Sequence, residues 1–220
     1  MKNVLDQLAS TLPRVGRRSL RGFRQSVVAL LLNSVLFLAS LLWFVPLLEA
    51  DEDVAVGMAM IGFFVHPILA VGLGITGLLA ARGAGAGAAT LVEAFWPPSR
   101  WVSNLLVASL TAALVGLGAI LLVLPGLLVL ARLSFAIYYA NNLALSPLAA
   151  MRESWRLTRG STALVVFLTL LSLGLLFGGL LFYVVGVVPV VAFLVVAWGA
   201  LFDVLREDQA KDATGSVRPD

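Results

Sequence analysis

The sequence predicts an all-α integral membrane protein, a bundle of six transmembrane helices with basic interfacial helices and both termini in the cytoplasm. Of its 220 residues, 60% are hydrophobic and only 12% are charged, whereas a soluble domain is about a quarter charged. A soluble fold of this size could not bury so much apolar surface, so most of the chain must be dissolved in lipid. The run from Gly160 to Phe202 carries no charge at all, which is enough for two crossings with a tight turn.

Apolar runs and their breaks give the six spans in order. They are expected at about 27–48, 54–81, 102–123, 127–142, 161–182 and 187–205. Pro125 and Gly126 are the expected turn before the fourth span, which is shorter than the ~20 residues that usually cross a bilayer. Gly186 and Pro189 mark the turn before the sixth. Residues 1–205 are thus one polytopic domain, and the charged tail 206–220 is expected to be flexible.

The distribution of charge predicts the orientation. With six spans and an inner N-terminus, Arg132 is the only basic residue inside a span, and the other fourteen of the 15 Lys and Arg residues lie on the inner side. The charges left for the outer loops are Glu49, Asp51, Glu52 and Asp53. This asymmetry obeys the positive-inside rule and predicts a multi-pass protein of the cytoplasmic membrane.

The basic composition also bears on partners. The net charge is +3, but Lys and Arg stand beside apolar runs, which favours anionic lipid headgroups over nucleic acid. Cysteine is absent, so neither disulfides nor thiol ligands are available. His66 is the single histidine and has no carboxylate near it in the sequence, so we expect neither a metal site nor a cofactor.

Five arginines follow Pro13 and fall on roughly one third of a helix surface at 100° per residue. They are Arg14, Arg17, Arg18, Arg21 and Arg24. One interpretation is a face that binds lipid or a partner protein at the inner leaflet. The other is a basic flank that only sets the orientation of the first span.

A second basic helix is expected at about 147–159. Ser146 can cap its N-terminus and Pro147 suits the first helical position. Its arginines flank an apolar face of Leu148, Met151 and Trp155, and they are Arg152, Arg156 and Arg159. This pattern is typical of an interfacial helix.

Five polar residues fall inside the predicted spans: Arg132, His66, Asn33, Asn141 and Asn142. An Arg there costs about 3 kcal/mol on insertion scales. Arg132 is therefore expected to contact an anion or headgroup, to be satisfied by helix-end carbonyls such as those near Pro125, or to snorkel outward. His66 could relay protons or bind a ligand, or it could be a neutral imidazole bonded to backbone near Pro67. The asparagines are expected to hydrogen-bond between helices.

Two basic segments resemble each other. RRSLRGFRQS (Arg17 to Ser26) and RESWRLTRGS (Arg152 to Ser161) match at three arginines and two serines in register, and each leads into a span from the same side. Duplication would explain the match, as would convergence on a basic membrane entry.

The stretch from Pro125 to Gly160 resembles a known family. Its pattern is a Pro-Gly pair, an Arg before a small and aromatic stretch, then Pro, Ala and a Ser-Trp-x-Leu-Thr-x-Gly ending. The matching residues are Pro125, Gly126, Arg132, Ser134, Phe135, Ala136, Pro147, Ala150, Ser154, Trp155, Leu157, Thr158 and Gly160. The pattern is similar to the polytopic domain that precedes the catalytic domain of some glycerophosphodiester phosphodiesterases, and to its stand-alone prokaryotic relatives. Relatives often have an acidic residue where Asn141 and Asn142 stand here.

That resemblance implies a six-helix membrane domain without catalysis of its own. The sequence likewise lacks paired intramembrane carboxylates, a His-Asp pair, a G-x-S-x-G elbow and a P-loop. We therefore expect a non-enzymatic membrane domain that engages anionic lipid or a partner protein. The alternative is a small transporter or accessory permease subunit with a pathway near Arg132 and His66; an intramembrane lipid hydrolase lacks its catalytic groups.

Overall fold

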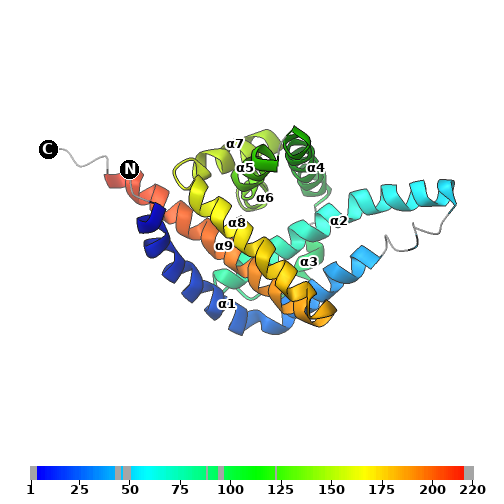
Figure 1. Ribbon diagram of the computed structural model, residues 1–220, viewed down its shortest axis with the longest axis horizontal. Helices are drawn as coiled ribbons and strands as arrows, with labels where there is room; N and C mark the ends of the chain where they lie inside the picture. Colours follow the sequence, from blue (N-terminus) through cyan, green and yellow to red (C-terminus); the bar gives the residue numbers. More distant parts are fainter. Residues whose placement is uncertain are drawn as a thin grey trace.

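The computed structural model describes residues 4–42, 46, 51–87, 89–93, 97–121 and 123–215, which form helices and their connections (Figure 1). The helices are α1 (Val4–Leu41), α2 (Glu52–Ala81), α3 (Thr90–Glu93), α4 (Pro98–Leu121), α5 (Val123–Leu133), α6 (Ala136–Asn142), α7 (Pro147–Thr158), α8 (Thr162–Leu180) and α9 (Tyr183–Gly215). Over the described residues, five of them are long and apolar enough to cross a membrane: α1, α2, α4, α8 and α9. The described residues confirm the all-α prediction, and the five long apolar helices are compatible with a multi-pass membrane protein.

Helix α9 is the centre of the bundle. It packs against α1, α2 and α8, and Figure 1 shows it running between α1 and α8. The N-terminus of α1 and the C-terminal part of α9 lie at one end, whereas α2 begins at the far end. The shorter helices α5, α6 and α7 gather with α4 beside this group.

Aromatic residues join these two groups. Phe135, next to α6, and Phe202 of α9 are fully buried, with ring centroids 5.8 Å apart. Tyr138 of α6 lies 5.2 Å from the Phe202 ring, and Trp198 lies 5.7 Å from Phe135. Large rings at these spacings stabilise a contact beyond the area that they bury.

Helix α1 unites two segments that the sequence predicted separately. The basic segment and the first span form one helix, with a non-helical conformation at Ser26 (φ −121°, ψ 18°) where the basic part meets the apolar part. Ser161, which separates α7 from α8, has nearly the same conformation (φ −127°, ψ 22°). These two serines hold the same position in the two similar segments, so the likeness extends from sequence to backbone geometry.

The segment predicted as a flexible tail is helical in the structure as far as Gly215. Helix α9 continues through this region because residues 206–212 have few helix breakers and their acids find partners on α1. Residues 216–220 lie outside the described part of the chain, as do residues 43–45 and 47–50, where the first span was predicted to end.

The fourth span and its turn also differ from prediction. Pro125 and Gly126 lie inside α5, which begins at Val123, and do not separate it from α4, which ends at Leu121. Proline is tolerated in the first turn of a helix because its missing N–H would have no partner there. Gly126 then approaches α4 closely, since a Cβ on Gly118 would lie 2.8 Å from the Gly126 Cα. The expected single helix at 127–142 is two helices, α5 and α6, broken at Ser134 and Phe135.

The turn between the last two spans is shorter than predicted. The chain reverses at Leu181 and Phe182, and both Gly186 and Pro189 lie within α9. Gly186 instead faces Gly179 of α8, where a Cβ on Gly179 would lie 3.2 Å from the Gly186 carbonyl oxygen. The two glycines let the helices meet closely just after the turn.

Candidate functional site

The N-terminal half of α1 is held along the end of α9 by ion pairs. Arg14 donates to Asp208, with Nη1 and Oδ1 2.8 Å apart, and Arg18 donates to Glu207 at 2.9 Å. Two of the five arginines predicted to face lipid or a partner are thus turned toward the chain's own last helix.

The other three arginines of α1 remain exposed. Within the described residues, no carboxylate forms an ion pair with Arg17, Arg21 or Arg24. They therefore keep their charge available to an external anion.

Helix α7 adds a second basic surface at the same end. Gln7 of α1 donates to the carbonyl oxygen of Gly160 at 3.0 Å, which joins the start of α1 to the end of α7. Arg156 pairs with Glu153 at 3.0 Å, whereas Arg152 and Arg159 are exposed. We define the inner basic surface as Arg17, Arg21, Arg24, Arg152 and Arg159.

A polar cavity of about 460 Å³ opens between α1, α2 and α9 at this end. Its charged and amide side chains come from all three helices: Arg18, Arg21, Gln25, Arg82, Asp203 and Glu207. Arg82 donates two hydrogen bonds, of 2.7 and 2.8 Å, to the Asp203 carboxylate, and these bonds raise the pKa of Arg82. Arg82 also donates to Asn142 at 3.1 Å, which ties the cavity to α6.

The end of α2 gives the cavity its shape. The N–H of Gly83 bonds to the carbonyl of Ala80 and the N–H of Ala84 bonds to that of Leu79, each at 3.0 Å. With Gly83 at φ +70°, this is the Schellman arrangement that ends a helix and turns the chain away. The arrangement leaves Arg82 at the helix end, beside α1 and α9.

Arg132 lies in the last turn of α5 and against α7. Its guanidinium carbon is 5.1 Å from the centroid of the Trp155 ring, and Nη1 donates to the Trp155 carbonyl oxygen at 3.4 Å. A cation at a helix C-terminus also interacts favourably with the helix dipole. Among the alternatives raised by the sequence, this environment matches a carbonyl contact, although the carbonyl belongs to α7 and not to the region near Pro125.

Four residues of the family-like pattern, Arg132, Phe135, Ser154 and Thr158, meet in one cluster. Ser154 Oγ donates to the Arg132 carbonyl oxygen at 2.7 Å and accepts from the Phe135 N–H at 3.2 Å. Thr158 Oγ1 lies 3.5 Å from the same Arg132 oxygen. The pattern therefore couples the break between α5 and α6 to one face of α7.

His66 lies between two backbone carbonyls. Nδ1 is 2.9 Å from the Gly62 oxygen on its own helix, and Nε2 is 2.6 Å from the Ser40 oxygen of α1. A cavity beside it is lined by Ala39, Ser40, Ile61, Gly62, Val65 and His66 and does not reach Arg132. The structure thus places the two candidates of the transport alternative apart.

The three asparagines bond to other segments. Asn33 of α1 is buried and donates to Thr76 Oγ1 at 3.1 Å and to the Gly87 carbonyl at 3.3 Å. Asn141 donates to Asn104 Oδ1 at 2.7 Å. The Asn33 bonds draw the connection after α2 back against the bundle.

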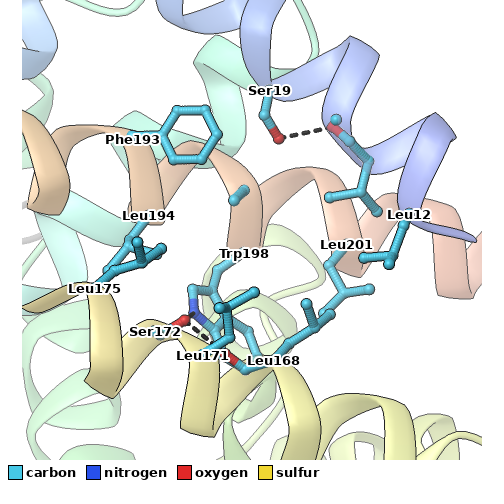
Figure 2. A pocket seen from close by; sticks show the side chains of 13 residues that line it. Leu12, Ser19, Leu168, Leu171, Ser172, Leu175, Phe193, Leu194, Trp198 and Leu201 are labelled. Atoms are coloured by element: carbon cyan, nitrogen blue, oxygen red, sulfur yellow. Dashed lines mark hydrogen bonds between the residues drawn. The ribbon is translucent and has the colours of Figure 1, made fainter. Parts of the chain in front are cut away.

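An apolar groove lies between α1, α8 and α9. Figure 2 shows Leu12 and Ser19 of α1 on one side and Leu168, Leu171 and Ser172 of α8 on the other. Trp198 of α9 donates to Ser172 Oγ at 3.2 Å within it. Such a surface suits the acyl chains of surrounding lipid.

Sequence reasoning missed the cavity residues Gln25, Arg82, Asp203 and Glu207. One signal was available, because Arg82 and Asp203 each directly end a long apolar run. The two residues are 121 positions apart in the chain, so no local sequence pattern reveals that they pair.

No protein-family model, curated protein or solved structure matches this chain.

Proposed function

We propose that this chain is a non-enzymatic protein of the cytoplasmic membrane whose inner basic surface engages anionic lipid headgroups or an anionic partner protein. One observation carries the proposal: among the described residues, four acids at this end are paired with the chain's own arginines, and the five exposed arginines of the basic surface have no carboxylate partner. Asp203, Glu207 and Asp208 bind arginines of α1 and α2, and Glu153 binds Arg156. Uncompensated cations beside apolar helices attract anionic headgroups, at about 1 kcal/mol per residue.

The surface of α7 supports lipid as the first partner. Leu148 and Trp155 are 73% and 47% exposed, next to the exposed Arg152 and Arg159. Apolar and aromatic side chains between basic residues are typical of a helix lying in the headgroup region.

Six crossings with both termini inside are part of the proposal. The ion pair between Arg14 and Asp208 supports an even number of crossings, because it joins the two ends of the chain. Five long apolar helices would leave the two ends on opposite sides, so a sixth crossing is needed. We assign it to α5 and α6, which together cover Val123 to Asn142.

We also retain the likeness to the membrane domain of glycerophosphodiester phosphodiesterases as a proposal. Its support is the cluster of Arg132, Phe135, Ser154 and Thr158. These four residues of the pattern hydrogen-bond to one another where α5 and α6 meet α7. The absence of catalytic motifs from the sequence supports a non-enzymatic role.

The transporter alternative has weaker support. It requires a path linking Arg132 and His66, but Arg132 contacts Trp155 and the cavity at His66 is lined by other residues.

The test is lipid preference, measured by native mass spectrometry of the detergent-purified protein with added phosphatidylglycerol or phosphatidylcholine. We expect more phosphatidylglycerol to bind, and we expect this excess to fall as salt rises. The quadruple variant Arg17→Gln, Arg24→Gln, Arg152→Gln, Arg159→Gln should lose most of the excess. The double variant Asp51→Asn, Asp53→Asn is the control. It changes charge at the opposite end of the molecule and should keep the excess of bound phosphatidylglycerol. A salt-independent excess that survives the quadruple variant would count against the lipid proposal.

A further inference from the structure

We propose that the polar cavity between α1, α2 and α9 binds one singly charged phosphodiester, with Arg21 as its cationic anchor. This rests on the proposed function, and it adds a saturable site to a surface that otherwise attracts anions diffusely. The shared chemistry is that of a phospholipid headgroup and of a free phosphodiester.

The charges of the cavity determine which anion fits. It holds three guanidinium groups and two carboxylates. Arg82 binds both oxygens of Asp203, and Arg18 contacts both oxygens of Glu207 at 2.9 and 3.0 Å. Arg21 is left without a carboxylate among the described residues, so the cavity has one positive charge in excess. A phosphodiester carries one negative charge and neutralises it, whereas a doubly charged phosphate would leave a net negative site beside two carboxylates.

The walls provide room and hydrogen-bonding groups. The volume of about 460 Å³ lies within the ~300–1,000 Å³ typical of small-molecule sites. Gln25 contributes an amide, and Gly83 contributes no side chain to this wall. At Gly83 a Cβ would lie 3.4 Å from Gln25 Oε1, at the same wall.

The position of the cavity favours a ligand from the membrane. Ala81 and Arg82 end α2 after a long apolar helix, which is where headgroups meet a transmembrane span. A headgroup can therefore enter while its acyl chains stay in the bilayer.

The experiment compares two single variants on one helix. Arg21→Gln removes the anchor, while Arg17→Gln removes an exposed charge one turn earlier that does not line the cavity. Native mass spectrometry measures the affinity for the first bound phosphatidylglycerol, and size-exclusion chromatography checks that each variant is folded. We expect Arg21→Gln to weaken the first binding event about tenfold or more, as expected for a lost charged hydrogen bond, and Arg17→Gln to weaken it less than about twofold.

Soluble probes distinguish the source of the ligand. Glycerophosphoglycerol, the deacylated headgroup, and inorganic phosphate are tested as competitors of the first phosphatidylglycerol. Failure of both to compete supports a lipid site, and competition by glycerophosphoglycerol alone supports the phosphodiester from either source. Stronger competition by inorganic phosphate would overturn the charge argument.

The result also separates this proposal from the one on which it rests. Equal weakening by Arg21→Gln and Arg17→Gln, with the preference for phosphatidylglycerol intact, overturns the site and leaves the lipid-binding surface standing. If the unmodified protein shows no preference for phosphatidylglycerol, both the site and the lipid-binding surface are overturned.

Discussion

The hydroxyl of Ser154 bridges a broken helix, because it donates to the Arg132 carbonyl at the end of α5 and accepts from the Phe135 N–H before α6. One side chain from α7 thereby satisfies two backbone groups that the break would leave unpaired in a buried region. Backbone polar groups without partners are costly where water is absent. The bridge thus explains how the helical path can be interrupted between α5 and α6.

Replacing Ser154 with Ala should destabilise the protein by about 1–3 kcal/mol, the usual cost of leaving buried polar groups unpaired. Thermal unfolding of the detergent-solubilised protein would measure the effect. Ser10→Ala is the matched control, because Ser10 is exposed and its hydroxyl donates only to the Gln7 carbonyl of its own helix among the contacts described. Equal stability of the two variants would contradict the bridging role.

Arg132 and Trp155 should be energetically coupled. A cation over an indole ring contributes about 0.5–1 kcal/mol at an exposed site, so Arg132→Gln and Trp155→Leu should destabilise less together than the sum of their separate effects. A double-mutant cycle by chemical unfolding measures this difference. The control pairs Arg132→Gln with Leu148→Ala, a residue that is also exposed on α7, and the two effects on stability should add. If the effects of Arg132→Gln and Trp155→Leu also add, the coupling is refuted.

The ion pairs between α1 and α9 should protect the basic helix from protease. The variant Glu207→Gln, Asp208→Asn removes the acceptors of Arg18 and Arg14, each pair worth about 0.2–1 kcal/mol at a surface. Trypsin should then cleave α1 several-fold faster in the purified protein, and raised salt should have a similar effect on the unmodified chain.

The control for this prediction is Glu153→Gln, which breaks an ion pair within α7 and should leave cleavage of α1 unchanged. Equal protection of α1 in the unmodified protein and in the double variant would show that apolar packing alone holds the helix.

The proposed six crossings predict that the α4–α5 junction faces outward. The chain contains no cysteine, so Ile120→Cys, at a position 83% exposed, provides a single label site. We expect a membrane-impermeant maleimide to label it in intact cells, and to label Arg24→Cys only after permeabilisation. If Ile120→Cys also required permeabilisation, α4 and α5 would form a hairpin that enters and leaves on the inner side.

Local patterns predicted the elements whose causes are local. Helix α7 begins at Pro147 after Ser146, at the predicted boundary, although the Ser146 side chain makes no capping hydrogen bond. The charge-free run forms α8 and most of α9. The long span at 54–81 matches α2 within two residues at its start. In each case the deciding interactions are within the helix or between the helix and lipid.

The remaining features depend on distant residues. The break at Ser134 and Phe135 depends on Ser154, and the helical tail depends on partners near the start of the chain. The sequence likewise showed five basic residues on one face of α1, but not which of them Glu207 and Asp208 would neutralise. The cavity became visible only once α2 and α9 were placed beside Gln25.

The close pairing of α1 with α9 has a consequence for biosynthesis. Arg14 and Asp208 are separated by 194 positions, so α1 receives its carboxylate partners on α9 only after all the intervening helices have been made. Contacts between such remote segments form late, because a long loop must close first. Until then Arg14 and Arg18 lack these two acids, and under the proposed function the arrival of α9 transfers both arginines from an anionic surface to Asp208 and Glu207.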